Sequence, residues 1–149
     1  MTIYIASDHG GFSLKNELVE AIEQNIVDLG PYELDTKDDY PDFAKLVAEK
    51  VMNESDALGI LICRSGNGMV MTANKFKGCY AALCFTSHHS EMARRDDNAN
   101  ILCLDADYEG EDPLKIVNSF LNTEFTGMDS RHGRRFNKIK EIEGINFRD

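Results

Sequence analysis

The sequence lacks any apolar run long enough to cross a membrane, and its N-terminus has neither the basic segment nor the apolar core of a signal peptide. We therefore expect a cytoplasmic protein. Basic residues are few, since 16 Lys and Arg stand against 26 Asp and Glu, giving a net charge of −10. That balance argues against a binder of nucleic acid or of anionic membranes, although a local basic cluster can still bind a small anion.

Paired cysteines are also missing. The four cysteines form no CxxC pair, so neither a zinc site nor a disulfide framework is indicated. Each lies in or at the end of an apolar, strand-like run, and we expect reduced thiols: Cys63, Cys79, Cys84 and Cys103. There is no Walker loop, no GxGxxG and no HExxH pattern, which leaves nucleotide binding and metal binding with little support.

Apolar runs of strand length alternate with segments of helical periodicity along all 149 residues. The predicted strands cover residues 2–6, 25–29, 57–63, 79–85 and 100–104. Predicted helices follow each strand, near residues 12–22, 40–51, 69–76, 87–95 and from 113, and a last helix carries Phe136, Ile139 and Ile142. This alternation predicts an α/β fold with a three-layer, Rossmann-like, doubly wound parallel five-stranded sheet, a single domain over residues 1–149 with a C-terminal helix.

The most informative stretch is residues 57–75, where an apolar run ends at Cys63 and a Ser-Gly-Asn-Gly loop precedes a helix. A continuous apolar run is typical of a strand buried on both faces, and ligands bind at the carboxyl ends of such strands. Glycines let the backbone approach a ligand, and nearby amides can lower the pKa of a thiol. Read alone, however, a buried structural thiol is the better interpretation of Cys63.

Two other segments carry candidate chemistry. Asp8 and His9 follow the first predicted strand, and the ends of strands one and three can be neighbours in a parallel sheet. We therefore expect Asp8, His9 and Cys63 to share one pocket. The dense basic cluster at residues 131–135 fits either a solvated helix face or recognition of a phosphate by guanidinium groups.

Taken together, these segments resemble the ribose-5-phosphate isomerase B family, which includes the galactose-6-phosphate isomerase subunits. The resemblance covers nearly the whole chain. Its markers are residues 7–11 (SDHGG), 39–41 (DYP), 60–63 (ILIC), 65–68 (SGNG), 73–75 (ANK), 99–102 (ANIL), and Arg131-His132 with Arg135.

The resemblance implies cofactor-free aldose–ketose isomerisation of a phosphorylated sugar, most simply ribose 5-phosphate to ribulose 5-phosphate. It also implies a homodimer with active sites at the subunit interface, and a tetramer fits as well. Cys63 would be the base that moves a proton between C1 and C2. Ser65 and the backbone of residues 64–68 would stabilise the enediolate oxygen. Asp8 would contact the sugar hydroxyls, and His9, Arg131 and Arg135 would bind the phosphate.

The implied substrate-binding residues are Asp8, His9, Tyr40, Arg64, Gly66, Asn67, Gly68, Asp97, Arg131 and Arg135. Some family members use instead a glutamate just after the second loop glycine. Met69 occupies that position here, so this chain looks like the cysteine-dependent kind.

Two segments depart from the family pattern. Asp96 and Asp97 stand where the family usually has a ring-opening histidine followed by asparagine, and Asp107 stands where many members have arginine. We assign ring opening to Asp96 on the expectation that burial, or the neighbouring charge of Asp97, raises its pKa. Asp97 and Asp107 also add negative charge where an anionic substrate is expected.

Three alternatives stay open. The substrate can be another sugar phosphate, such as a hexose 6-phosphate, or the chain can be a divergent subunit that needs a partner chain. A receiver-like signalling domain also has five βα units. Such a domain needs paired acids after strand one and an aspartate ending strand three, where this chain has Ser7-Asp8 and Cys63.

Overall fold

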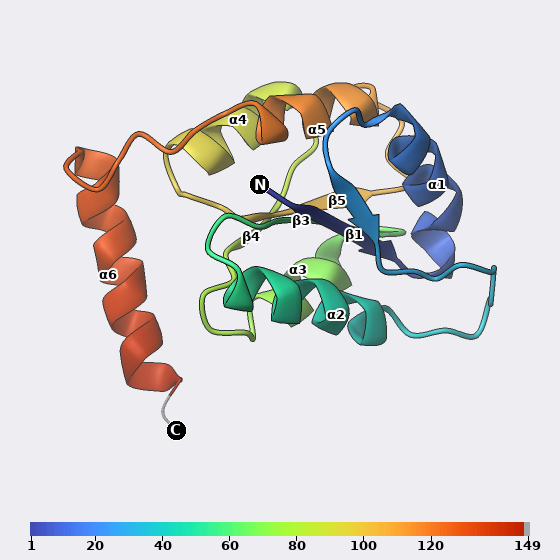
Figure 1. Ribbon diagram of the computed structural model, residues 1–149, viewed down its shortest axis with the longest axis horizontal. Coiled ribbons are helices and arrows are strands. Elements are labelled where there is room, and N and C mark those ends of the chain that lie inside the picture. Colours follow the sequence, from blue (N-terminus) through green and yellow to red (C-terminus); the bar gives the residue numbers. More distant parts are fainter. Residues whose placement is uncertain (148–149) are drawn as a thin grey trace.

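Five parallel strands form the central sheet of the computed structural model, which describes residues 1–147 (Figure 1). They are β1 (Ile3–Ser7), β2 (Ile26–Asp28), β3 (Leu58–Cys63), β4 (Ala81–Leu83) and β5 (Ile101–Asp105). Their order is β2-β1-β3-β5-β4, and every pairing is parallel. The chain thus winds from β1 to β2 on one side and then to β3 on the other, which confirms the predicted doubly wound topology.

Helices cover both faces of this sheet. They are α1 (Phe12–Ala21), α2 (Tyr40–Asn53), α3 (Asn67–Ala73), α4 (Ser87–Arg95), α5 (Pro113–Leu121) and α6 (Arg131–Asn146), with a short 3-10 turn η1 (His9–Gly11) before α1. In Figure 1, α1, α4 and α5 lie on one face and α2 and α3 on the other, while α6 stands beside the layers. The predicted three layers and C-terminal helix are therefore present. Within the described part of the chain, no helix combines the length and apolarity needed to cross a membrane.

The core has two parts because successive strand residues face opposite sides of the sheet. Ile3 and Ile5 of β1 pack in the cluster that includes α1 and α5, whereas Tyr4 and Ala6 pack in the cluster with α2 and α3. All six residues of β3 are buried. Burying one large aliphatic side chain stabilises the fold by about 1.5–3 kcal/mol, so this central strand is held firmly and fixes the position of the thiol at its end.

Two predicted helix starts agree with the structure. Pro41 lies in the first turn of α2, where its missing N–H costs nothing, and the apolar stripe of Ala44, Val47, Ala48 and Val51 is buried. Asp112 caps α5, because its carboxylate accepts a hydrogen bond from the backbone N–H of Leu114 at 3.0 Å.

The boundaries of α3 and β4 differ from the prediction. Helix α3 begins before residue 69 and ends at Ala73, since the side chain of Asn74 binds the backbone of Ala81 through both its oxygen and its nitrogen. Strand β4 has three residues, not seven, because it is an edge strand that pairs only with β5, and Thr86 soon caps α4.

Helix α6 contacts the rest of the chain at few points. Phe136 is buried edge-on against Tyr80 at 4.8 Å between ring centroids, and Glu143 accepts hydrogen bonds from the N–H of Gly78 and the hydroxyl of Tyr80. Ile139 and Ile142 are 45% and 61% exposed. The predicted apolar residues of the helix therefore divide, and only Phe136 joins the core of the described chain.

Candidate active site

Cys63 is the last residue of β3, and its side chain is buried at the carboxyl edge of the sheet. Its Sγ accepts a hydrogen bond from the backbone N–H of Gly66 at 3.2 Å. Gly66 has φ +78°, and a Cβ there would lie 2.5 Å from Leu83 Cδ1 and 3.0 Å from the oxygen of Leu104. Only glycine fits this turn. The turn directs the amide dipole of Gly66 at the sulfur.

The other three cysteines have a different environment. Burial raises the pKa of Cys79 and of Cys84 to about 11, and it also raises the pKa of Cys103. These thiols stay protonated at neutral pH and act as small apolar side chains. The tight turn at Gly66 therefore distinguishes Cys63 from them.

The loop after Cys63 is flanked by α2. Ser65 Oγ accepts a hydrogen bond from the N–H of Asn67 at 3.3 Å, and both residues are exposed. Gly68 lies so close to Tyr40 that a Cβ would be 2.6 Å from the tyrosine ring. Tyr40 thus begins α2 and also packs against the loop that follows Cys63.

Asp8 lies next to Cys63 because β1 and β3 are neighbours. Ser7 is paired with Ile62 in the sheet, so the next positions along the two strands are Asp8 and Cys63. The N–H of Asp8 binds the oxygen of Ile62 at 3.2 Å, and its carboxylate accepts a hydrogen bond from the N–H of Gly11 at 3.1 Å. The expected meeting of these two strand ends is present.

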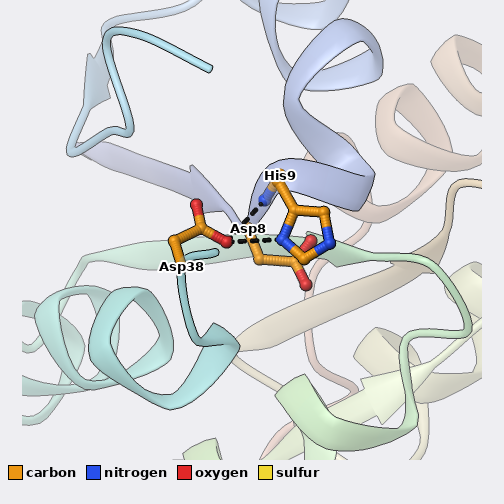
Figure 2. A group of neighbouring side chains, drawn as sticks. All are labelled: Asp8, His9 and Asp38. Atoms are coloured by element: carbon orange, nitrogen blue, oxygen red, sulfur yellow. Dashed lines mark hydrogen bonds and ion pairs between the residues drawn. The ribbon is translucent and has the colours of Figure 1, made fainter. Parts of the chain in front are cut away.

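His9 is held by a residue that the sequence did not single out. Asp38, in the loop before α2, accepts hydrogen bonds through Oδ1 from His9 Nδ1 at 2.6 Å and from the His9 backbone N–H at 3.0 Å (Figure 2). The hydrogen bond to Asp38 raises the pKa of His9, and the charge of Asp8 adds to the effect. The two residues are 29 positions apart, and the one available signal was the acidity of the loop.

Asp8, His9 and Asp38 each offer a donor atom, and these atoms lie within 4.8 Å of one another. Such a group could hold a metal ion. However, His9 and Asp38 are already joined to each other, and Asp8 holds the N–H of Gly11. Asp38 Oδ1, His9 Nδ1 and one oxygen of Asp8 are therefore already engaged in internal hydrogen bonds.

A second group of predicted site residues lies at the amino edge of the sheet. Asp96 follows α4 and precedes β5, whose five residues span about 16 Å at ~3.3 Å per residue. Its Oδ1 lies 2.9 Å from Arg95 Nε and 3.7 Å from His132 Nε2. Within one chain, Asp96 is thus separated from Cys63 by the length of the sheet.

The expectation for the charge of Asp96 was wrong. The pKa of Asp96 is lowered, mainly by its hydrogen bond to Arg95, with further contributions from the charges of Arg95, His132 and Arg131 that outweigh burial. Asp97 is exposed and does not reverse this effect. Asp96 is therefore an ionised carboxylate at neutral pH, which can accept a proton but has none to donate.

Basic side chains border the same region. Arg131 and Arg135 stand one turn apart at the start of α6, and both are exposed. Ser130 caps this helix by accepting a hydrogen bond from the N–H of Gly133 at 3.0 Å. At the other edge, Asp107 forms an exposed ion pair with Arg64, with 3.1 Å between Oδ2 and Nε, so its charge is locally compensated.

The fold is that of a doubly wound α/β protein, and the cysteine loop lies at the carboxyl ends of the neighbouring strands β1 and β3, where chain connections go to opposite sides and where open α/β sheets bind their ligands. The family model described as Ribose/Galactose Isomerase matches residues 3–139, and the chain belongs to this family. The resemblance inferred from the sequence is thereby confirmed. Met69, at the position where some members carry glutamate, is fully buried in the core beside α2.

Relatives of known structure share this fold. The chain is 49% identical to a probable ribose-5-phosphate isomerase B of Mycoplasma genitalium over 95% of both chains. The crystal structure of ribose-5-phosphate isomerase B from that organism, with bound ribulose-5-phosphate, superimposes with a TM-score of 0.88 over 95% of both chains at 48% identity. The type B enzyme of Trypanosoma cruzi gives 0.90 at 38% identity, covering 98% of this chain and all of the other.

Proposed function

We propose that this chain is an aldose–ketose isomerase that interconverts ribose 5-phosphate and ribulose 5-phosphate. The observation that carries the proposal is the position of the Cys63 thiol at the end of a buried strand, where it accepts a hydrogen bond from the backbone N–H of Gly66. The chain that carries this thiol is a member of the isomerase family. The named relatives and the bound ribulose-5-phosphate in one of them support the choice of substrate. Family membership also leaves the receiver-domain alternative without support.

The reaction moves two protons and no net electrons: one passes from C2 to C1, and the other passes from the hydroxyl on C2 to the oxygen on C1. In the forward direction the Cys63 thiolate takes the proton from C2 of the open-chain aldose, and the electron pair forms a cis-enediolate. Ser65 and the amides of residues 64–68 stabilise the developing oxyanion, because preorganised donors need no rearrangement as charge appears. The thiol then returns the proton to C1, which gives the ketose.

Substrate binding divides between the two edges of the sheet. Asp8 contacts the sugar hydroxyls, with Tyr40, Asn67 and the backbone of the loop around them. His9, Arg131 and Arg135 bind the phosphate. The guanidinium groups match phosphate geometry, and binding at the phosphate positions C1 and C2 near the sulfur.

Such a site needs two copies of the chain. Arg131 and Arg135 lie at the opposite edge from Cys63, so one chain does not bring its own arginines to its own thiol. We infer a homodimer in which each active site combines the cysteine loop of one subunit with the arginines of the other. Exposed Ile139 and Ile142 on α6 offer apolar surface for such a contact. Pairing of two such dimers into a tetramer is a separate step that the active site does not need.

Ring opening falls to the second group of residues. An ionised Asp96 accepts the proton of the anomeric hydroxyl, and His132, 3.7 Å away, is placed to give a proton to the ring oxygen. Asp97 lies beside them as a substrate contact. We further propose that residues 1–149 act as one isomerase domain in the cytoplasm.

The test is NMR of ribose 5-phosphate, ribulose 5-phosphate and galactose 6-phosphate with the purified protein in D2O. We expect interconversion of the two pentose phosphates with deuterium incorporation, and a loss of about 10²–10⁴-fold in Cys63→Ala. Cys84→Ala, which alters a buried thiol elsewhere, should keep its turnover. Activity on galactose 6-phosphate alone would mean that the substrate is a hexose phosphate and not a pentose phosphate. Activity that appears only with a second, unlike chain would indicate a divergent subunit.

A further inference from the structure

Asp38 is a largely buried carboxylate whose two oxygens have very different hydrogen bonding. Its side chain is 9% exposed, and Oδ1 accepts two hydrogen bonds from the same residue, His9. Its second oxygen, Oδ2, is buried and has no hydrogen-bond partner among residues 1–147. A buried carboxylate is costly unless its charge is compensated, and here the compensation comes from His9.

The geometry fixes the orientation of the His9 ring. Nδ1 is committed to Asp38 at 2.6 Å, a short distance typical of a charge-assisted hydrogen bond, and the adjacent backbone N–H binds the same oxygen. Figure 2 shows one nitrogen of the ring joined to Asp38 and the other nitrogen on the far side from Asp38. That nitrogen, Nε2, is therefore presented away from the loop.

We propose that Asp38 is a positioning residue for phosphate recognition, which holds His9 as an imidazolium and directs its Nε2–H at the substrate phosphate dianion. The inference rests on the proposed function, in which His9 binds phosphate. The charged groups that act on His9 are Asp38, Asp8 and Arg64, the last of which opposes protonation. The Asp38 side chain accepts its hydrogen bonds from His9, so its effect on the substrate is indirect.

A metal ion is the competing occupant of this cluster. It would have to displace the hydrogen bond between His9 and Asp38 and the one that Asp8 accepts from Gly11. The oxygen of Asp38 without a partner is Oδ2, whereas Oδ1 is the oxygen that accepts the hydrogen bonds from His9. The observations thus favour an ion pair aimed at an anion.

The test compares Asp38→Asn with Asp39→Asn, a change in the adjacent exposed acid. Asparagine keeps an acceptor for His9 but removes the charge, and an NH2 at the Oδ2 position breaks no hydrogen bond. Without the carboxylate, His9 loses its proton nearer the ordinary pKa of 6.5. As the pH is raised, the phosphate affinity of the variant should then fall at a lower pH than that of the unaltered enzyme.

We expect the KM of Asp38→Asn for ribose 5-phosphate to rise about 3- to 10-fold at pH 8, with kcat within about 2-fold. Near pH 6 the ratio of the two KM values should approach one. Dividing the KM of the variant by that of the unaltered enzyme at the same pH cancels the effect of the titration of the substrate phosphate. Asp39→Asn should track the unaltered enzyme, and Asp38→Ala should bind weakly at every pH because the ring is no longer oriented.

A direct readout is the ¹H–¹⁵N NMR titration of His9, assigned with His9→Gln, which should give a lower pKa in Asp38→Asn. Equal losses of kcat and kcat/KM at all pH values, or an unchanged His9 titration, would overturn the proposal. So would saturable binding of Zn²⁺ or Mn²⁺ that disappears in the variant. Because the NMR titration needs no turnover, it remains decisive even if the unaltered protein fails to isomerise the pentose phosphates.

Discussion

The two edges of the sheet are built in different ways. At the carboxyl edge, Cys63 is buried and is oriented by backbone, through a glycine turn that no other residue fits. At the amino edge, Arg131 and Arg135 are exposed side chains on the first turns of a helix that stands beside the layers. At one edge backbone geometry therefore orients the thiol, whereas at the other edge exposed side chains supply positive charge, which in the proposed dimer reaches toward a second copy.

The acids at the two edges also differ, both in their partners and in which group of the pair has a shifted pKa. Asp38 is buried and paired with His9, and the pair raises the pKa of the histidine. Asp96 is paired with Arg95, whose charge is permanent, and it is the pKa of the carboxyl that is lowered. One pair prepares a titratable cation and the other an ionised base, so the partner decides what each carboxylate can do.

The largest expected effect comes from separating the two edges on different subunits. Cys63→Ala homodimers and homodimers carrying both Arg131→Ala and Arg135→Ala should each lose about 10²-fold or more of their activity. After the two proteins are mixed by reversible unfolding, half of the dimers pair unlike subunits, and each of these has one intact site. Activity should recover to about a quarter of the unaltered value.

The control for this recovery mixes Cys63→Ala with Cys63→Ser, both altered at the carboxyl edge, and should give no recovery. If the first mixture also stays inactive while both proteins refold as dimers, the two edges do not combine across an interface. The division of the site between subunits would then be wrong.

A smaller effect follows from the two glycine turns, one at each edge. Gly66→Ala puts a Cβ against Leu83 and the Leu104 backbone in a left-handed conformation, and we expect a loss of about 2–4 kcal/mol in stability. Gly78→Ala, also left-handed but in open space, should lose only about 1–2 kcal/mol. Urea unfolding measures both.

The activities of these variants sharpen the result. Because the Gly66 amide bonds to the sulfur, Gly66→Ala should also lower kcat at temperatures where it is folded, whereas Gly78→Ala should not. Equal stability losses in the two variants would mean that the loop relaxes around the added methyl group. The claim of a rigid backbone at the reacting centre would then fail.

The sequence was most informative where local patterns decide structure. The apolar run into Cys63 predicted a buried strand, and the Tyr40-Pro41 start with its stripe predicted α2, because burial and periodicity are read from neighbouring residues. The end of α3 depends instead on the Asn74 side chain binding Ala81. Ile142 shows a further limit, since periodicity reveals an apolar face but not what covers it.

The site was predictable as a set of residues more than as an arrangement. Asp8 and Cys63 were placed together correctly, since the alternating pattern predicts a parallel sheet in which the ends of strands one and three can be neighbours, as those of β1 and β3 are. The contact between His9 and Asp38 joins two loops and leaves no local signal. For Asp96, the adjacent acid suggested a raised pKa, but Arg95 turns its guanidinium onto the carboxylate, a side-chain direction that the sequence does not contain.

The smallest expected effect concerns Asp96 and separates ring opening from proton transfer. Ribose 5-phosphate closes into a furanose, whereas ribulose 5-phosphate cannot, because its O5 carries the phosphate. Asp96→Asn keeps an acceptor for Arg95 but removes the base. It should slow isomerisation of ribose 5-phosphate by about 10-fold, at the low end for a general base because the ring also opens unaided.

Deuterium exchange into C1 of ribulose 5-phosphate should be unchanged in the same variant, because the open-chain ketose bypasses Asp96. Glu91→Gln, which alters the other carboxylate bound to Arg95 at 2.8 Å, should affect neither rate. Slowing of both reactions by the same factor would place Asp96 in the proton transfer itself or in the fold, and no slowing would mean that the ring opens without it. The second result would narrow the role of the amino edge to holding the phosphate, and would leave all bond changes to the edge that carries Cys63.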